Sequence, residues 1–343
     1  MELQIWMGRA GAGKSRRVLE TMQERRQRPQ ILLVPEHASH EAELDLCRAL
    51  GPTASRDAEV LSFRNLATRV MAQTGGLADV TLDAGGKLLT MRRALQEVSS
   101  RLTVFARPSQ RPAFLRQLVA LADELYAYQV TPEMLLAQVA DMEGAAGDKL
   151  RSAALIYGAY DAHLRGEGFD ARSRVQKLCD ALPESDYLMG KDVYVDGFSY
   201  FNRVEEDILE TALRQGNCLT VTLLGDESDP QLFQNALRQR DRLKRMAALV
   251  HARCEVETLV SKNDGPLGYL ERCFFDGEEP WQGEEPPIRL YQAETAFSEA
   301  EYVSACVRRL ARQGCRWRDI GVAARNMEVY GPLLEAVFRR DGI

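Results

Sequence analysis

The feature that most constrains the fold is a glycine-rich stretch at residues 8–15, which fits the pattern G-x-x-x-x-G-K-[ST]. An apolar run at residues 3–7 precedes it, and residues 16–22 follow with a helical pattern. In this arrangement a strand enters a tight turn whose backbone N–H groups surround phosphates, and the dipole of the next helix favours negative charge. We therefore interpret the stretch as a phosphate-binding loop rather than a chance glycine-rich turn. Its members are Gly8, Arg9, Ala10, Gly11, Ala12, Gly13, Lys14 and Ser15.

Two side chains of this loop have predicted roles toward a nucleoside triphosphate. Lys14 is expected to reach the β- and γ-phosphate oxygens, and the Ser15 hydroxyl is expected to bind Mg²⁺. The sequence therefore predicts ATP and Mg²⁺ as cofactors.

An acid at the tip of a second strand completes such a site by holding the metal. Asp196 follows the apolar run at residues 193–195 and is the candidate, the alternative being an ordinary aspartate in a turn. Enzymes of this type that hydrolyse the triphosphate often carry a glutamate directly after this acid, and here the position is Gly197. Glu205 or Glu206 in the following helix is a candidate substitute.

Length and composition predict a globular, cytoplasmic protein with more than one domain. The 343 residues exceed an ordinary single core, and 45% of them are hydrophobic and 27% charged. The seven cysteines lack any C-x-x-C spacing, which favours a reducing compartment. We see neither a signal peptide nor an apolar run of membrane-spanning length, so no membrane partner is expected.

Charge is unevenly distributed along the chain, although the net charge is −6. Residues 1–30 and 238–253 are basic, whereas residues 276–301 are acidic. Such runs most often form solvated helix faces. For the basic runs, a groove that follows a DNA backbone is the alternative interpretation.

Short apolar runs with β-forming residues alternate with helical patterns, which predicts a parallel sheet with helices on both faces. The runs lie at residues 31–34, 59–61, 193–195, 219–224 and 256–259. Between residues 82 and 182 the apolar residues instead recur at helical spacing, as in Phe114, Leu118 and Leu125. We therefore expect an all-helical insertion there.

These patterns divide the chain into a phosphate-loop domain, an insertion and a second α/β domain. The first is assigned to residues 1–81 and 183–275, and the helical insertion to residues 82–182. An acidic linker rich in Pro and Gly follows at residues 276–287. Residues 288–343 begin the second domain, with expected strands at 288–291 and 320–324 and a helix at 333–338. We expect this domain to be truncated.

The order of these segments resembles superfamily 1 DNA helicases, and most closely the AddB family. AddB proteins form one half of the bacterial AddAB-type ATP-dependent helicase/deoxyribonucleases. The resemblance implies a RecA-like P-loop fold in the first domain and the start of a second RecA-like domain. It runs over the whole chain and is carried, in order, by residues 8–15, 31–37, 61–67, 195–206, 223–226 and 319–325.

The resemblance also implies site residues outside the phosphate loop. Ser62, Phe63 and Arg64 match the helicase segment that contacts single-stranded DNA, and Asp226 lies where helicases couple ATP to DNA. Arg325 matches an arginine directed at the γ-phosphate. The candidate catalytic residues are therefore Lys14, Asp196 and Arg325, and the candidate metal ligands are Ser15 and Asp196.

The partners implied by the resemblance are single-stranded DNA, duplex DNA ends and an AddA-type helicase/nuclease subunit in a heterodimer. In the family an iron–sulfur cluster and the nuclease belong to the C-terminal part, so none of these cysteines is assigned to the cluster. Two departures from the helicase pattern bear on function. Only seven residues precede Gly8, where an adenine-recognising segment is usual, and Gly197 replaces the expected glutamate.

Three functions remain open at this point. The first is an ATP-binding, helicase-like N-terminal region that serves the processing of double-strand DNA ends for recombinational repair, with weak or absent motor activity of its own. The second is a non-hydrolysing scaffold that binds nucleotide and DNA. The third, ranked lower because of the ordered helicase-like segments, is an unrelated phosphate-loop kinase.

Overall fold

The computed structural model describes residues 1–51, 53–75, 82–105, 111–140, 142–166, 174–260, 265–274, 280–283 and 288–343. The chain divides into two compact units, Met1–Asn263 and Asp264–Ile343. The first contains the sheet and the phosphate loop, and each unit is described separately below.

The first unit is built on a six-stranded parallel sheet, which confirms the predicted α/β fold. Its strand order is β3-β2-β4-β5-β1-β6, so β5 separates β1 from β4. The strand predicted before the phosphate loop and the five further predicted runs all fall within strands or extend one by a single residue. The strands are β1 (Glu2–Gly8), β2 (Gln30–Leu33), β3 (Ala58–Leu61), β4 (Asp192–Val195), β5 (Cys218–Leu224) and β6 (Arg253–Leu259).

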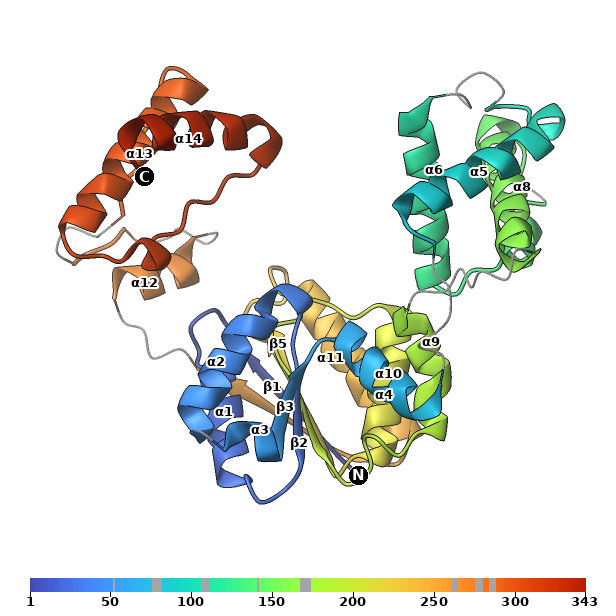
Figure 1. Ribbon diagram of the computed structural model, residues 1–343. Helices are drawn as coiled ribbons and strands as arrows, with labels where there is room; N and C mark the ends of the chain where they lie inside the picture. Colours follow the sequence, from blue (N-terminus) through green and yellow to red (C-terminus); the bar gives the residue numbers. More distant parts are fainter. Residues whose placement is uncertain are drawn as a thin grey trace. The chain divides into compact units, whose positions relative to one another are not determined.

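Helices cover both faces of this sheet (Figure 1). On one face lie α1 (Lys14–Glu24), α2 (Ser39–Leu50) and α3 (Ala54–Asp57), with a short 3-10 turn η1 (Glu36–Ala38) before α2. On the other lie α4 (Phe63–Thr74), α9 (Arg174–Ala181), α10 (Arg203–Gln215) and α11 (Gln234–Leu249). The 3-10 turn η4 (Leu182–Glu184) follows α9.

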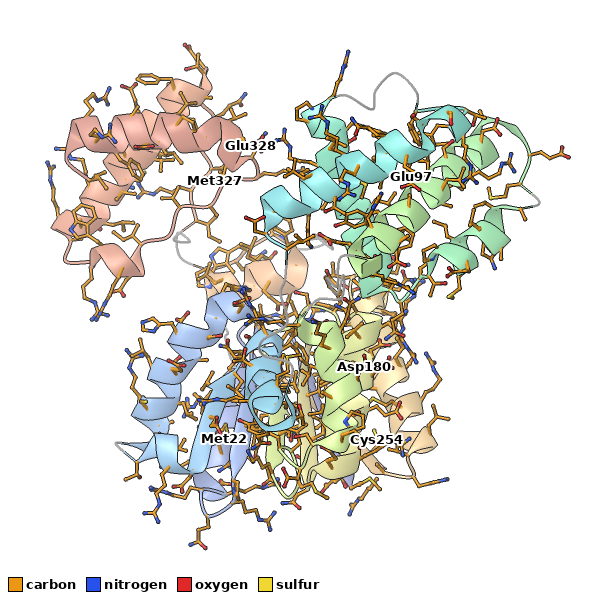
Figure 2. All side chains as sticks on the ribbon, turned by 45° about the vertical axis from the view of Figure 1, so that its right-hand side comes forward. Met22, Glu97, Asp180, Cys254, Met327 and Glu328 are labelled. Carbon is orange, nitrogen blue, oxygen red and sulfur yellow. The ribbon has the colours of Figure 1, made fainter. Side chains whose placement is uncertain are left out.

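The two-residue period of β1 explains why both faces are apolar. Leu3, Ile5 and Met7 point to the α4–α11 face, while Trp6 points to the opposite one. Met22 of α1, labelled in Figure 2, is fully buried in the same cluster as Trp6. A sheet buried on both sides in this way holds the ends of its strands in fixed positions, which is what a site at the carboxyl edge requires.

Between β3 and β4 the regular structure of the described residues that follow α4 is helical. The helices are α5 (Ala84–Val98), α6 (Pro112–Ala127), α7 (Pro132–Val139) and α8 (Gly144–Gly166), with a 3-10 turn η2 (Ser99–Arg101). They have a core of their own that includes Met91, Leu95, Ile156 and Tyr160. The next helix, α9, packs instead against α4 and α10, and its Leu178 joins the core of the sheet.

In the second unit, the regular structure of the residues that the structure describes is helical. It contains α12 (Pro266–Cys273), α13 (Ala296–Arg312), a 3-10 turn η5 (Trp317–Asp319) and α14 (Met327–Asp341). Helices α13 and α14 share a small core of Ala300, Leu334 and Val337. Of the predicted linker at 276–287, only residues 280–283 lie within the described part of the chain.

The two strands predicted in this unit are wrong, because neither residues 288–291 nor residues 320–324 form a strand. Their β-forming composition suits a strand, but a strand is stable only when neighbouring strands satisfy its backbone groups. Leu290 is fully exposed, so this apolar side chain is not buried by any neighbouring layer. The helix predicted at 333–338 lies within α14 and is confirmed.

Within the described ranges, no helix combines the length and apolar character needed to cross a membrane.

Candidate nucleotide site

The phosphate loop joins β1 to α1 through two glycines in the left-handed region. Gly11 has φ 74° and Gly13 has φ 84°, values that cost an L-residue about 1–2 kcal/mol. Gly8 is constrained differently, because a Cβ there would lie 2.8 Å from the carbonyl oxygen of Leu259 on β6. The glycines of the sequence pattern are therefore required by backbone conformation and by the close approach of a neighbouring strand.

The first turn of α1 presents backbone amides without a competing side chain. Gly13 is the N-cap and supplies no side-chain acceptor, and the first turn contains no acidic residue. The N–H groups of a first helical turn lack intrahelical partners, so an anion can satisfy them. Ser15 is exposed in this turn. These features fit the phosphate groups that the sequence predicts.

Lys14 folds back over the loop. Its Nζ donates hydrogen bonds to the carbonyl oxygens of Gly8 at 2.6 Å and Arg9 at 2.9 Å. The ammonium group is thus held at the loop by the two residues that begin it.

Asp196 lies directly after the buried strand β4, at the same carboxyl edge as the loop. Since β5 separates β4 from β1, the two strand ends are about two strand spacings, or roughly 10 Å, apart. The buried Thr222 of β5 donates its hydroxyl hydrogen to Asp196 Oδ1 at 2.5 Å. This bond orients the carboxylate at the edge of the sheet.

Gly197 adopts φ 82°, again in the left-handed region. A Cβ at this position would lie 3.4 Å from Cδ of Pro35, which is near ordinary van der Waals contact. The backbone conformation therefore disfavours a glutamate here more than the available space does. The chain therefore differs from the hydrolase pattern at this position in backbone conformation as well as in residue type.

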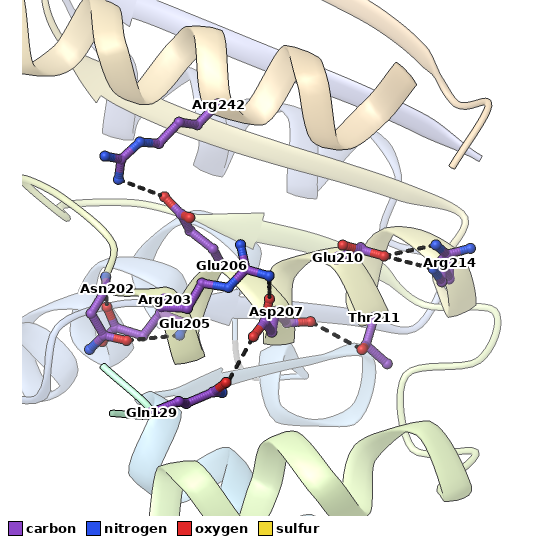
Figure 3. Close-up of polar contacts among 10 residues, drawn as sticks. All are labelled: Gln129, Asn202, Arg203, Glu205, Glu206, Asp207, Glu210, Thr211, Arg214 and Arg242. Carbon is purple, nitrogen blue, oxygen red and sulfur yellow. Dashed lines mark hydrogen bonds and ion pairs between the residues drawn. The ribbon is translucent and has the colours of Figure 1, made fainter. Parts of the chain in front are cut away.

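Glu205 and Glu206, the candidate substitutes, are both engaged elsewhere (Figure 3). Glu205 forms a capping box with Asn202 at the start of α10, with both hydrogen bonds at 2.9 Å. Burial raises the pKa of Glu205, and the Asn202 backbone N–H only partly offsets this. Glu206 accepts hydrogen bonds from Gln239 at 3.1 Å and from Arg242 at 3.3 Å. Both carboxylates thus hold α10 in place.

An ion pair that sequence reasoning missed joins the loop to the segment after β5. Arg9 Nε lies 2.7 Å from Asp226 Oδ2, and the guanidinium carbon is 5.2 Å from the ring centroid of Phe233. Burial raises the pKa of Asp226, but hydrogen bonds from Ser228 and Arg9 outweigh it, so the net shift is downward. The Gly-Asp pattern marked Asp226, but no local signal pointed to a partner 217 residues away.

The three predicted DNA-contacting residues differ in exposure. Ser62 is 3% exposed and caps α4 by accepting from Asn65 N, and Phe63 is 5% exposed and packs against Phe198. Arg64 is exposed and lies 3.5 Å from Glu36. Of the three, Arg64 presents a charged group to solvent, while the other two shape the start of α4.

Arg325 is exposed in the second unit, between η5 and α14. The phosphate loop, Asp196 and Asp226 gather in the first unit at one edge of the sheet.

A buried acid lies at the opposite, amino edge of the same sheet. Asp192 begins β4 and is fully buried, with Arg25 and Arg28 at 4.0 and 3.9 Å from its Oδ2. Burial raises the pKa of this carboxyl, and the two arginines only partly oppose the shift. The sequence shows an aspartate at the start of an apolar run, but it does not indicate that Arg25 and Arg28 lie next to it.

Comparison with known proteins places this architecture in a family. Residues 5–270 match a family model described as "ADDB, N-terminal". The chain is 33% identical to a protein of Desulforudis audaxviator over 369 residues, which cover 100% of the chain and 31% of that protein. It is 31% identical to one of Moorella thermoacetica, covering 99% and 32%, and 29% identical to one of Geobacillus thermodenitrificans, covering 98% and 31%. Each of the three is named as a subunit of an "ATP-dependent helicase/deoxyribonuclease". The chain thus spans about a third of the length of these relatives.

Proposed function

The chain belongs to the ADDB N-terminal family, and from this premise we propose that it is the ATP-binding, helicase-like N-terminal region of an ATP-dependent helicase/deoxyribonuclease subunit. The observation that carries the proposal is the uncapped first turn of α1 behind the left-handed Gly11 and Gly13. The proposed domains are those predicted from the sequence, namely a RecA-like domain, a helical insertion and the start of a second RecA-like domain, except that α9 is assigned to the first domain and α12 to the second unit.

In this proposal the loop amides and Lys14 hold the triphosphate, and Ser15 and Asp196 hold Mg²⁺. When bound, Mg²⁺ supplies positive charge next to the phosphate oxygens. The protein's own contribution is positioning. Gly8 allows β6 to approach the loop, Thr222 orients Asp196, and the Arg9–Asp226 pair joins the loop to the end of β5.

We propose that hydrolysis by this region is weak or absent. The support is the left-handed backbone of Gly197, together with the structural engagement of Glu205 and Glu206. A glutamate at position 197, or a free carboxylate at Glu205 or Glu206, would be needed to polarise the attacking water.

The proposed wider role is the processing of double-strand DNA ends for repair, in a heterodimer with an AddA-type subunit. The names of the relatives support a DNA substrate and a multi-subunit enzyme. Arg64 is the proposed DNA contact at the carboxyl edge, since its side chain is exposed and cationic. Arg325 remains the proposed γ-phosphate contact from the second domain.

Titration of the purified chain with a fluorescent ATP analogue and Mg²⁺ tests the central claim. Lys14→Ala should abolish measurable binding, because its ammonium is the cation proposed to hold the β- and γ-phosphates. Arg26→Ala is the matched control, as Arg26 follows the far end of α1 and bonds to Thr53. Unchanged affinity of Lys14→Ala would rule out the loop as the nucleotide site.

A non-hydrolysing scaffold is the second candidate, and the conformation of Gly197 favours it. ATP turnover with and without single-stranded DNA distinguishes the two. Strong stimulation by DNA that disappears in Asp196→Ala would reject the scaffold and indicate a working motor. ATP binding without turnover would favour the scaffold.

A further inference from the structure

A groove of about 910 Å³ runs between α10 and α11. Its floor is apolar and includes Phe201, Leu243 and Met246, which are at most 8% exposed. Two large side chains at its borders are unusually exposed, Leu249 at 74% and Tyr200 at 67%. An apolar groove with exposed apolar borders is typical of a surface that binds a partner.

The α11 side of the groove carries a stripe of arginines. Arg238, Arg242 and Arg245 are spaced by four and three residues, so they lie on one face of the helix. Arg242 is paired with Glu206. Arg238 and Arg245 are exposed and have no ion-pair partner among the residues that the structure describes.

The α10 side carries three carboxylates, and each already has a partner (Figure 3). Glu206 pairs with Arg242, Asp207 with Arg203 at 3.1 Å, and Glu210 with Arg214 at 2.8 Å. The unmatched charge in the groove is therefore positive and lies on the α11 side. A nucleic-acid backbone would meet these carboxylates along its length, which disfavours it as the occupant.

We propose that this groove docks an acidic amphipathic helix of a protein partner. The apolar stripe of that helix packs on the groove floor, Leu249 and Tyr200. Two acidic residues on one side of it, seven positions apart, pair with Arg238 and Arg245. The spacing of the two acidic residues matches that of the two arginines, because seven residues rise about 10.5 Å along the axis of either helix. The α10 side, whose carboxylates already have partners, faces neutral or basic residues of the partner.

A designed peptide tests the proposal with the whole 343-residue chain. The probe is a fluorescein-labelled helix of about 20 residues with Leu at i, i+3, i+4 and i+7 spacing and Glu on one side only. A scrambled peptide of equal composition and an oligo-dT of similar length are run in parallel by anisotropy. The helix should bind, and the double variant Arg238→Glu/Arg245→Glu should weaken it by about tenfold or more.

Lys244→Glu is the matched control, because Lys244 is exposed on the same helix but does not line the groove. It should leave peptide affinity within about twofold of the parent chain. Three results would each overturn the proposal. Lys244→Glu could weaken peptide binding as much as the double variant, or the scrambled peptide could bind as tightly as the designed one. The third result is that Arg238→Glu/Arg245→Glu weakens the binding of oligo-dT but not that of the peptide.

The apolar component is tested separately with Leu249→Ser. The side chain is mostly exposed, so the variant should keep the parent melting temperature while its peptide affinity falls severalfold. Sedimentation velocity of the parent chain distinguishes a second copy from a different partner. Concentration-dependent dimers that Leu249→Ser abolishes would overturn the proposal in favour of self-association.

Discussion

Replacing Gly197 by glutamate would restore the hydrolase sequence pattern, and we expect it to cost stability without restoring turnover. The backbone there has φ 82°, which costs an L-residue about 1–2 kcal/mol. Removing a glycine also restricts the unfolded chain, which offsets about 0.4–1 kcal/mol. Space contributes little, since the added Cβ would lie 3.4 Å from Pro35 Cδ. The expected net loss is therefore about 1 kcal/mol.

Urea denaturation of Gly197→Glu and Gly197→Ala measures this loss, and the two variants should agree because the penalty belongs to the backbone. Gly158→Ala is the control within the same unit. Gly158 lies inside α8, its added Cβ would lie 3.5 Å from Pro132 Cβ, and alanine there should stabilise by up to about 1 kcal/mol.

ATP turnover with single-stranded DNA completes the test. If the backbone is held left-handed, the new carboxylate does not take the position of a catalytic glutamate, and turnover should stay at the parent level. A Gly197→Glu variant that is as stable as the parent and gains DNA-stimulated turnover would refute this reasoning.

Three further outcomes follow from the same sheet. Thr222→Val removes the hydroxyl that bonds to Asp196, so the Mg²⁺ concentration needed for half-maximal ATP binding should rise, and an unchanged value would contradict the orienting role. A double-mutant cycle of Arg9→Ala and Asp226→Ala should give a coupling of about 1 kcal/mol in urea unfolding, since the pair is partly buried, and additive effects would show that the contact is not formed. Burial raises the pKa of Asp192, so its charge opposes folding once the pH exceeds the ordinary aspartate pKa. The melting temperature of Asp192→Asn should therefore rise relative to that of the parent between about pH 4 and about pH 8. A difference in melting temperature that stays constant over this range would reject the prediction.

The sequence predicted most of the first unit because its signals are local. The apolar run of β1, the glycines of the loop and the helical pattern of α1 lie within 24 residues, and each depends on its own backbone preference. The alternation of strands and helices then indicated a parallel sheet, although not its strand order. Strand order depends on packing between distant segments, which periodicity does not report.

The wrong strand predictions and the unforeseen burial of Phe63 have the same physical origin. Residues 288–291 and 320–324 have strand-like composition, but composition supplies no neighbouring strand. The DNA-contacting role predicted for Phe63 stays a prediction, but the burial of its ring was not foreseen, because Phe198, far along the chain, packs against it. In both cases the outcome depends on a partner that the local sequence does not specify.

Strand β5 contacts both halves of the proposed nucleotide site. Its Thr222 bonds to Asp196, the proposed metal ligand, and just beyond the end of the strand Asp226 is paired with Arg9 of the phosphate loop. A shift of this strand along its axis would disturb both contacts together. A residue inserted between Thr222 and Asp226 would preserve at most one of the two contacts. Changes at Asp196 and at the phosphate loop are therefore not independent, and a substitution that shifts β5 should affect both.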